Sequence, residues 1–440
     1  MSIALTNAVL FDYDPPGVRK GCLVLDGGTI AAAGPDAVPT ADQETMDCGG
    51  AIVMPGLVNG HTHLYSALAA GMPAPPKPPR NFHEILEFIW WRLDRALDAD
   101  SIRISGLIGA LDALHCGTTT LIDHHASPNC IDGSLDALER GIDEVGLRAV
   151  LCYETTERNG PGESESGLRE NRRFIDLCRK RDDGRFAALV GAHAAFTLSD
   201  QALAACVQLA NDTATGVHIH VAEDPCDDRI CRERYGATLV DRLERSGITE
   251  SGSPVASGSI LAHCTHLAPD TADRVSKRVA AVAHNPRSNM NNRVGYAPIG
   301  ELSRVQLGTD GIGSDMFAEA GHAWFKACDA KTAIEPGRVV QMLAQAAKTA
   351  GDRLGVTLGR LEAGAAADIV VTDYVPATPI DTENACAHLL FALAARHVRH
   401  VFVNGNIALR DREAVAIEES DVRKGAVTTA RQLWQRMQSF

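Results

Sequence analysis

The chain of 440 residues is long enough for one large barrel with an appended domain, or for two or three separate domains. Its 45% hydrophobic and 22% charged residues are typical of a globular protein with a sizeable core. The formal net charge of −14 argues against a nucleic-acid-binding surface, and no run of about 18 apolar residues suggests a membrane-spanning helix.

The first 55 residues contain short β-like runs separated by Gly, Pro and Asp, which predict a small antiparallel sheet. The runs are 3–11, 21–34 and 51–56. No secretory signal is expected, because Asp12 and Asp14 interrupt the opening before a sufficient apolar run develops.

From residue 56 to about 360, apolar strand-like runs alternate with helical stretches such as 101–117, 199–212 and 237–247. This alternation indicates parallel strands with crossover helices, and eight strands are the number that closes a TIM barrel. The predicted strands are 57–63, 118–123, 147–155, 186–197, 215–224, 258–267, 279–286 and 305–311. A Pro-rich loop at 72–82 follows the first strand, so we expect it over the carboxyl-terminal mouth, where barrel active sites lie.

After residue 360 the β-like runs return at 365–374 and 397–411, the second with an Asn-Gly turn. Neither β-rich end can bury a face alone. We therefore expect residues 1–55 and 361–440 to form one composite β-sandwich domain with a C-terminal helical tail, and residues 56–360 to form the barrel.

Twelve cysteines are scattered along the chain without a Cys-x-x-Cys pair. This spacing predicts free thiols in a reducing cytosol, and hence a cytoplasmic protein, rather than a disulfide framework or a structural zinc knuckle. Cys226 and Cys231, which lie closest together in sequence, are interpreted as an incidental pair.

The first predicted barrel strand ends in "HTH", with His61 and His63 two residues apart. In an extended strand such residues point to the same face, about 6–7 Å apart, which allows two imidazoles to bind one metal ion. The alternative is a polar strand edge. Other strand ends favour the metal: His218, His220 and Glu223 end the fifth strand, His263 the sixth and Asp310 the eighth.

A barrel gathers these strand ends around one mouth, and imidazoles with a carboxylate suit a zinc-like divalent ion. The motifs "PGLVNGHTHL", "HIHVAED", "AHCTHL", "HNPRSNMN" and "GTDG", in this order, resemble the cytosine-deaminase and chlorohydrolase branch of the amidohydrolase superfamily. The resemblance covers essentially the whole chain. More narrowly, "HTHLYSALAAGMP", "EFIWWRLDRALD", "DHHASPN" and "SNMNN" resemble the aminohydrolases called SsnA.

Carried over by position, the resemblance implies that His61, His63, His220 and Asp310 bind the metal. His220 is chosen over His218 because it lies three residues before Glu223, as in the branch pattern; His218 is expected deeper in the barrel. The strand-four segment "GAHAAFT" has no bridging lysine of the kind found in two-metal members. One divalent ion per chain is therefore expected, zinc in the first place and ferrous iron as the alternative.

The implied reaction is hydrolytic attack at an sp² ring carbon flanked by nitrogen. A divalent ion lowers the pKa of bound water from about 15.7 toward 7 and so provides hydroxide. Asp310 accepts the water proton, Glu223 protonates a ring nitrogen and then the leaving group, and His263 holds the developing oxyanion or the attacking oxygen.

Substrate contacts are expected from His193, His124, His125, Trp90, Arg80, Arg287 and Asn289. Trp90 and Trp91 lie on a helix-like stretch, 82–97. Because adjacent residues on a helix diverge by about 100°, at most one of them is expected to face the pocket. Arg287, with Lys77 and Arg80, either binds a substrate carboxylate or is solvated surface charge. Ser288 is expected to brace the site, and His266 to be a surface or capping residue.

The predicted function is an aminohydrolase that deaminates a small heterocycle such as a purine, pterin or pyrimidine. The same site could release chloride, or sulfide from a thiohydantoin-like ring, or open a cyclic amide, and the sequence does not choose among these. A metal-retaining binding protein and a structural zinc protein are the non-enzymatic alternatives, and the presence of both Glu223 and Asp310 argues against them. A homodimer or larger homo-oligomer is expected by resemblance.

Overall fold

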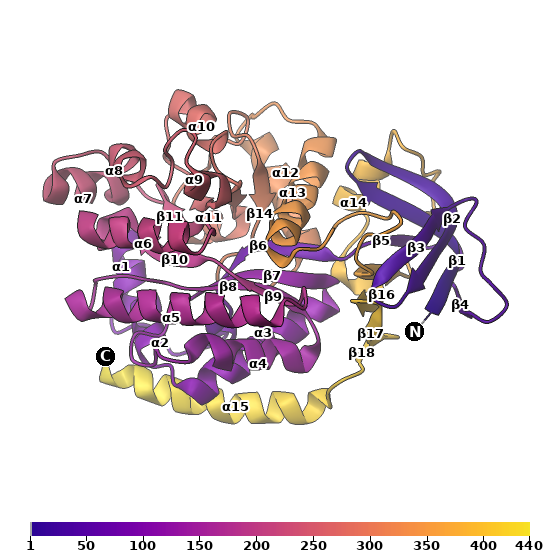
Figure 1. Cartoon of the computed structure of the whole chain (residues 1–440), viewed down its shortest axis with the longest axis horizontal. Helices are drawn as coiled ribbons and strands as arrows, with labels where there is room; N and C mark the ends of the chain where they lie inside the picture. The colour runs from indigo at the N-terminus through magenta and orange to yellow at the C-terminus, as the bar shows by residue number, and fades with distance from the viewer. Residues whose placement is uncertain (1) are drawn as a thin grey trace.

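Two parallel β-sheets form the centre of the computed structural model, which describes residues 2–440 (Figure 1). The strand orders are β6-β7-β8-β9 and β10-β11-β12-β13-β14. The strands are β6 (Leu57–Thr62), β7 (Thr118–His125), β8 (Arg148–Tyr153), β9 (Phe186–Ala188), β10 (Val190–Ala194), β11 (Val217–Val221), β12 (Ile260–His263), β13 (Ala281–His284) and β14 (Val305–Leu307). The predicted α/β class with parallel strands is confirmed.

The predicted strand 186–197 differs from the structure because the chain changes its partner there. β9 pairs with β8, whereas β10 pairs with β11. Two isolated parallel bridges, Thr155–Ala192 and Thr62–Asp310, join residues of one sheet to residues of the other. These bridges bring the carboxyl ends of strands from both sheets close together.

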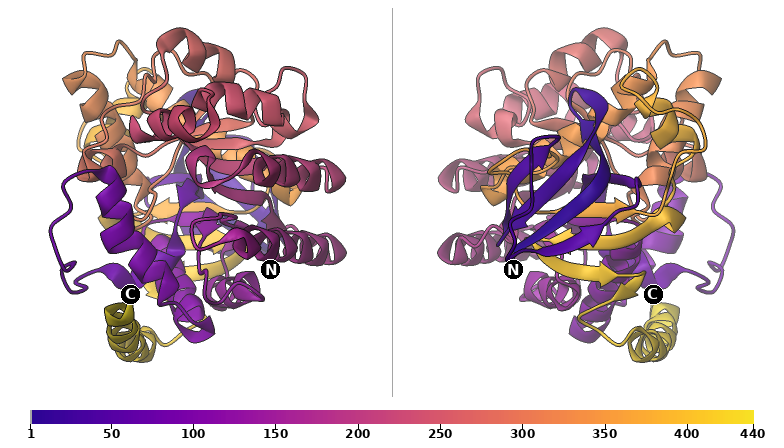
Figure 2. Two further views of the ribbon diagram at one scale, coloured as in Figure 1. Left: turned by 90° about the vertical axis from the view of Figure 1, so that its left-hand side faces the viewer. Right: turned by 90° about the vertical axis from the view of Figure 1, so that its right-hand side faces the viewer.

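Helices cover the outside of the two sheets (Figure 2). The strands are buried throughout, as expected for parallel strands with helices packed on them. The main helices are α3 (Ala99–His115), α4 (Ser134–Val145), α5 (Pro161–Arg181), α6 (Asp200–Asp212), α7 (Cys226–Tyr235), α8 (Leu239–Ser246), α9 (Pro254–Gly258), α10 (Pro269–Ser276), α11 (Pro286–Asn292), α12 (Met316–Asp329) and α13 (Pro336–Leu354).

The helical starts follow the capping residues in the sequence. Ser199 accepts a hydrogen bond from the Ala202 amide at the start of α6, and Thr238 forms a capping box with Asp241 at α8. Asp98 and Ser101 form another capping box, so α3 begins before the predicted start at residue 101. The predicted helix at 82–97 is divided into α1 (Phe82–Ile85), a π-helical turn η2 (Leu86–Trp90) and α2 (Trp91–Arg95).

Both ends of the chain contribute to one nine-stranded sheet, at the right of Figure 1. Its order is β18-β17-β16-β15-β5-β1-β2-β3, with β4 pairing with β1. The predicted run 21–34 is a hairpin, because Gly27 adopts a positive φ of 55° between β2 and β3. The strands are β1 (Ser2–Tyr13), β2 (Pro16–Asp26), β3 (Thr29–Gly34), β4 (Glu44–Asp47), β5 (Ile52–Pro55), β15 (Ile369–Thr372), β16 (Val398–Val403), β17 (Asn406–Arg410) and β18 (Glu413–Ala414).

The helices after β15 bring the last part of the chain back across the parallel sheets. α14 (Ala385–Phe391) packs on α12 and α13, and α15 (Glu419–Arg436) runs along the lower edge in Figure 1. The Trp434 Nε1–H donates to the Leu68 carbonyl over 2.9 Å, and Arg436 Nε to the Ala96 carbonyl over 2.7 Å. α15 therefore holds the segments on either side of the turn η2.

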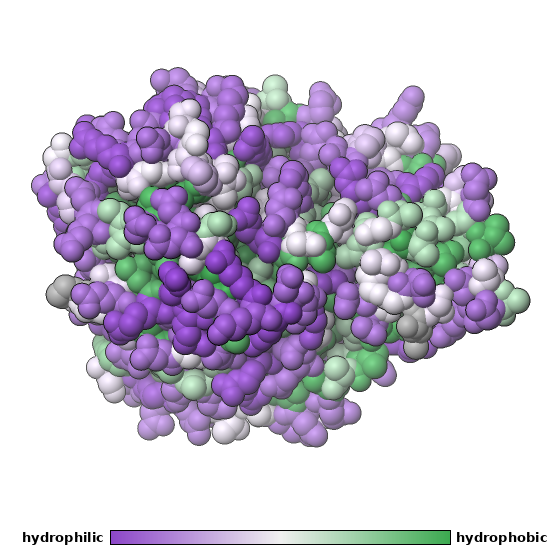
Figure 3. Space-filling model, in the orientation of Figure 1, coloured by the Kyte–Doolittle hydropathy of each residue, from purple (hydrophilic) through white to green (hydrophobic). Residues whose placement is uncertain are grey.

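Hydrophilic residues cover most of the molecular face in Figure 3, while hydrophobic residues gather over the nine-stranded sheet. Within residues 2–440, no helix combines the length and the apolar character needed to cross a membrane.

Candidate metal centre and active-site cavity

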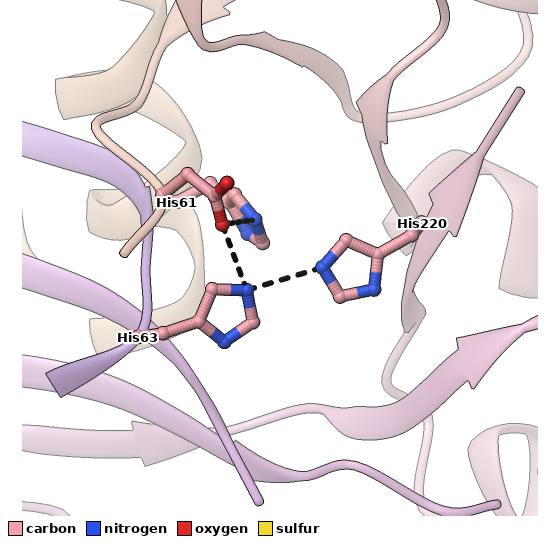
Figure 4. Close-up of side chains that lie close together, drawn as sticks. His61, His63 and His220 are labelled. Carbon is pink, nitrogen blue, oxygen red and sulfur yellow. Dashed lines mark hydrogen bonds and ion pairs between the residues drawn. The ribbon is translucent and has the colours of Figure 1, made fainter. Parts of the chain in front are cut away.

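Three imidazoles and one carboxylate meet at the carboxyl ends of the parallel strands. His61 and His63 come from the end of β6, His220 from β11 and Asp310 from the segment after β14 (Figure 4). His63 Nε2 lies 3.0 Å from Asp310 Oδ1 and 3.1 Å from His220 Nε2, and His61 Nε2 lies 3.5 Å from Asp310 Oδ1. One ligand atom from each of the four residues lies within 4.8 Å of the others.

Backbone carbonyls fix the orientation of His63 and His220. The His63 Nδ1–H donates to the His124 carbonyl over 2.6 Å, and the His220 Nδ1–H donates to the His193 carbonyl over 2.8 Å. In the neutral rings both Nε2 atoms then carry lone pairs, and these atoms face each other. Such a pair of acceptors needs a positive charge between them.

A chain of three side chains fixes His61. The Cys152 thiol donates to the Asp123 carbonyl, so its sulfur is free to accept from His218 Nδ1–H over 3.8 Å. His218 Nε2 then accepts from His61 Nδ1–H over 2.9 Å. His61 Nε2 is left buried, unprotonated and without a hydrogen-bond partner. His218 therefore lies below the centre and orients His61.

The four residues fit a divalent cation with nitrogen and oxygen ligands. Burial lowers the pKa of His61 to about 3, so its Nε2 is available as a ligand. At His63 burial acts in the same direction, but the Asp310 carboxylate outweighs it and raises the pKa to about 9. A proton on His63 therefore occupies the position of a cation in the metal-free chain, and metal binding releases it.

Two carboxyl groups beside the centre have opposite pKa shifts. Although burial alone would raise it, the adjacent imidazoles of His61 and His63 hold the pKa of Asp310 well below its usual range. Burial, reinforced by the Asp310 charge, raises the pKa of Glu223 well above its usual range. Asp310 is therefore ionised while Glu223 is protonated, which suits them to act as base and acid respectively.

Side chains around the centre orient its reactive groups. The Ser288 hydroxyl donates to Asp310 Oδ2 over 2.5 Å. The His263 Nδ1–H donates to Asn289 Oδ1 over 2.8 Å, which leaves His263 Nε2 as an acceptor 3.5 Å from Glu223 Oε2. Asn289 thus holds His263 instead of lining the cavity.

Backbone strain is concentrated at this edge of the sheets. Ala222, His263, Cys264 and Asp310 all have positive φ values, between 49° and 72°. Such conformations cost about 1–3 kcal/mol each in non-glycine residues and persist where the surroundings impose them. Two of these residues, His263 and Asp310, carry side chains of the site itself.

A cavity opens above the centre and is lined by polar and aromatic side chains. Two of the expected substrate contacts, His193 and Trp90, are among its lining residues. Its lining also includes His63, Tyr65, Phe82, Trp91, Glu154, Arg158, Phe196, Glu223, Asp227, Asn292 and Asp310. Aromatic walls with a few polar groups are typical of sites for planar ligands.

Both tryptophans line the cavity, in contrast to the prediction that only one could face it. The reason is the π-helical turn η2, which ends at Trp90 and is followed directly by α2, which begins at Trp91. The extra residue in such a turn changes the angular spacing from that of an α-helix. The angular spacing of an α-helix therefore does not describe the directions of Trp90 and Trp91.

The two predicted arginine contacts do not line the cavity. Arg80 has an 81% exposed side chain and pairs with Glu84 over 2.5 Å. Arg287 pairs with the buried carboxylate of Glu319 and donates to the Gly313 carbonyl over 2.8 Å. Arg80 is therefore a solvated surface charge, and Arg287 fastens α11 to α12.

Neither of the two histidines at the end of β7 lines the cavity. His124 Nε2 donates to the carbonyls of Ala192 and His218, over 3.2 and 3.1 Å. His125 Nε2 lies 2.9 Å from the Ser127 hydroxyl, and its ring is fully buried. Both histidines thus support the strand ends that carry the metal ligands. His266, expected at the surface or as a cap, bonds to the Val294 carbonyl.

Four acidic or basic residues of the site were not predicted: Asp94, Glu154, Arg158 and Asp227. Glu154 directly follows β8, so the strand-end rule that selected His263 and Asp310 could have found it. Arg158 and Asp94 lie on a loop and a helix and pair with each other. No local pattern in the sequence links these two residues, which are 64 positions apart.

The profile described as the Amidohydrolase family matches residues 52–408. A 5'-deoxyadenosine deaminase from Methanosarcina mazei is 29% identical over 451 residues, covering 99% of both chains. A 5-methylthioadenosine/S-adenosylhomocysteine deaminase from Desulforudis audaxviator is 30% identical, covering 94% of this chain and 95% of its own.

Two solved structures show the same fold. An adenosine deaminase from Xanthomonas campestris with bound zinc has a TM-score of 0.83 at 22% identity, covering 100% of this chain and 98% of that one. An atrazine chlorohydrolase from Arthrobacter aurescens in complex with zinc has a TM-score of 0.78 at 21% identity, covering 97% and 100%.

Proposed function

The chain belongs to the amidohydrolase family, and from this premise we propose that it is an aminohydrolase that releases ammonia from a ring carbon of a small nitrogen heterocycle. The hydrolase class expected from the sequence motifs is confirmed by the family match and by relatives named as deaminases. The observation that carries the proposal is that the carboxyl groups of Glu223 and Asp310 lie together beside one cluster of imidazoles, with the pKa of Asp310 lowered and that of Glu223 raised.

The proposed reaction consumes one water and one ring amine. The water oxygen bonds to the amine-bearing carbon, the carbon–nitrogen bond breaks, and the products are a ring carbonyl and ammonia. A divalent ion held by His61, His63, His220 and Asp310 would act as a Lewis acid that acidifies water near neutral pH.

The residues of the chain move the protons. Asp310 accepts a proton from the attacking water because its carboxylate is ionised. Glu223 donates its proton to the ring nitrogen beside the attacked carbon, and then carries a proton to the departing amine. His263 Nε2, held by Asn289, accepts a hydrogen bond from an O–H of the attacking water.

Purine-type amines are the first substrates to test, since the named relatives are deaminases of adenosine derivatives. Release of chloride, release of sulfide from a thiohydantoin-like ring and opening of a cyclic amide use the same acid and base, so they are the alternative reactions. A non-catalytic metal-binding protein is the remote alternative; it requires no protonated glutamate beside the centre.

We further propose that β6 to β14 close into one (β/α)₈ barrel over residues 56–360, and that residues 1–55 and 361–440 form a β-sandwich domain. The two bridges between the parallel sheets support closure, and the shared nine-stranded sheet supports the composite domain. Zinc is the proposed metal, with ferrous iron as the alternative. The unpaired state of all twelve cysteines, which lie within the described residues, supports a cytoplasmic enzyme. A homo-oligomer is also proposed.

The test is the Glu223→Gln variant with metal analysis and product mass spectrometry. We expect the variant to retain one metal ion per chain and to lose about 10²–10⁴-fold in turnover of whichever amine the native enzyme hydrolyses. Glu233→Gln, which changes an exposed glutamate on α7, is the control. Near-native turnover in Glu223→Gln would remove the proposed acid, and replacement of sulfur or chlorine by oxygen would replace deamination with an alternative reaction.

A further inference from the structure

One wall of the cavity contains polar groups that the proposed chemistry does not use. Glu154, Arg158 and His193 form this wall, here called the polar wall, and the ring of Trp91 lies against it. Glu154 and Arg158 are at least 94% buried, with side-chain exposures of 4% and 6%. Burial of such groups needs partners from the protein or from a ligand.

Arg158 offers a hydrogen-bond donor to the cavity. One end of its guanidinium is held by the buried carboxylate of Asp94, and its Cζ lies 5.2 Å from the centre of the Trp91 ring. Within residues 2–440, Nη2 makes the bond to Asp94, Nε is buried without a hydrogen-bond partner, and Nη1 makes no hydrogen bond to another residue. Since Arg158 lines the cavity, an acceptor atom of a ligand can complete its bonding.

His193 offers a hydrogen-bond acceptor to the same cavity. The Thr197 hydroxyl donates to the Ala194 carbonyl over 3.1 Å, so its oxygen accepts the His193 Nδ1–H over 2.8 Å. The other ring nitrogen, Nε2, carries no proton in the neutral form of this tautomer. Its Nε2 therefore presents a lone pair, and Thr197 determines this tautomer.

The donor and the acceptor are neighbours on the polar wall. Glu154 Oε1 lies 3.7 Å from Arg158 Nη2 and 3.9 Å from His193 Nε2, so the two side chains flank one carboxylate. The charge of Arg158 is already matched by two carboxylates, Asp94 and Glu154. A neutral ligand atom therefore suits this position better than an anion, which these carboxylates would repel.

We propose that the polar wall recognises a cyclic amide edge of the substrate, in which a ring N–H donates to His193 Nε2 and the adjacent carbonyl oxygen accepts from Arg158. The inference rests on the proposed function, since it assigns a class of ring to that enzyme. It predicts a preference for ring lactams over rings that present a bare nitrogen at this edge. A site built to bond such groups discriminates strongly, because an analogue without them leaves buried polar atoms unpaired.

Two matched pairs of amines test the preference. Guanine and 2-aminopurine carry the same amine, but only guanine has the N–H and carbonyl of a lactam. Isocytosine and 2-aminopyrimidine form the corresponding pair with a single ring. In 1-methylguanine a methyl group replaces the hydrogen of the ring N–H, whereas the adjacent carbonyl is kept. Binding is measured by calorimetry on the metal-loaded Glu223→Gln chain, and ammonia release on the native metal-loaded chain.

We expect at least one lactam to bind about 10²-fold more tightly than its lactam-free partner, and 1-methylguanine to bind more weakly than guanine. In Arg158→Met, the lactam of each pair should bind no more than about tenfold more tightly than its lactam-free partner. Because that change leaves Asp94 unpaired, the double variant Arg158→Met with Asp94→Asn keeps the charge balanced and repeats the test if the single variant does not fold.

Thr197→Val provides a readout that loss of packing would not give. Without the threonine oxygen, His193 can carry its proton on Nε2, so binding of the lactam-free rings should increase and the preference should fall about tenfold. Thr349→Val, which removes a buried hydroxyl on α13 far from the cavity lining, should leave the preference unchanged.

The outcomes separate this inference from the proposed function. Tight and selective lactam binding without hydrolysis of any amine would overturn the aminohydrolase but support the polar wall. Ammonia release without a preference for lactams would support the aminohydrolase but overturn recognition by the polar wall. Equal binding within each pair, or failure of both lactams to bind, would overturn the recognition proposed here.

Discussion

At the scale of single residues, the metal centre depends on which nitrogen of each imidazole carries a proton. Carbonyl groups set this for His63 and His220, whereas a side chain, His218, sets it for His61. Partners of this kind orient metal ligands and raise their basicity. His218, the other histidine of β11, thus orients a metal ligand without being a proposed ligand itself.

His218→Ala should weaken the metal site while leaving all four proposed ligands in place. His61 would lose the acceptor for its Nδ1–H, and the expected loss of metal affinity is about 10–100-fold. The measurement is competition with a chelator of known affinity. His400→Ala, at another buried histidine on β16, is the control and should retain native affinity; equal affinity in both variants would contradict the role of His218.

Asp227 provides a pH-dependent contribution to stability. Burial, reinforced by the neighbouring Glu223 carboxyl, raises the pKa of Asp227 to about 8. The folded chain therefore binds this proton more tightly than the unfolded chain, whose aspartate titrates near about 4. The contribution is complete below about pH 4 and is lost as the pH rises toward about 8.

Asp227→Asn keeps an oxygen that can accept the hydrogen bond from the Glu223 backbone N–H. The asparagine side chain, however, cannot ionise. The thermal midpoint of this variant, relative to native protein, should rise from pH 5 to about pH 8 and then level off. Thermal scans of the metal-loaded chains at several pH values measure the difference. A difference that stays constant across this range would show that Asp227 is already ionised in the folded protein.

At the scale of elements, strand polarity and one irregular helix build the site. Parallel strands direct their carboxyl ends to the same edge, which is why residues from β6, β11 and the segment after β14 meet. The turn η2 then places Trp90 and Trp91 on the cavity. The strands supply the reacting groups and η2 supplies aromatic walls.

Deletion of Glu87, a partly exposed residue of η2, should convert the π-helical turn into an α-helix. Trp90 or Trp91 would then rotate away from the cavity by roughly 100°. We expect a KM increase of about tenfold or more, with an unchanged far-ultraviolet circular dichroism spectrum. Glu87→Ala keeps the chain length and should have native KM; the same KM in both variants would mean that the turn does not set the tryptophan positions.

At the scale of the whole molecule, a buried ion pair links the parallel sheets to the nine-stranded sheet. Arg148 at the start of β8 donates to both oxygens of Asp368, over 2.9 and 3.2 Å, and Asp368 directly precedes β15. Arg148 also donates to Asn404 Oδ1 over 3.0 Å and to the Gly184 carbonyl. All these bonds are made far from the metal centre along β8.

Arg148→Met should destabilise the protein by about 3–5 kcal/mol, because it leaves the Asp368 carboxylate buried without its partner. The double variant with Asp368→Asn should recover part of this loss, since no unpaired charge remains. Urea unfolding of the metal-loaded chains measures both values. A double variant as unstable as the single one would show that packing of the arginine stem, rather than charge pairing, accounts for the effect.

Strand-like runs, their order and the polar residues at their ends could be read from the sequence because each depends on local pattern. His61, His63, Glu223 and Asp310 follow apolar runs directly, so parallel strand polarity alone suggests that they meet. The predicted contacts Arg80 and Arg287 show the limit of this reasoning. An arginine looks the same in sequence whether it faces a cavity or pairs with a carboxylate such as Glu84 or Glu319.

By itself the sequence determined the α/β class, the family and the residues proposed to bind metal, since periodicity and short motifs contain that information. The tertiary structure alone decided which nitrogen of each imidazole is free, that both tryptophans line the cavity, and that Arg158, Asp94 and Glu154 lie together. The reason is physical. Hydrogen-bond polarity and charge pairing depend on distances between side chains from separate elements, and such distances exist only after the chain has packed.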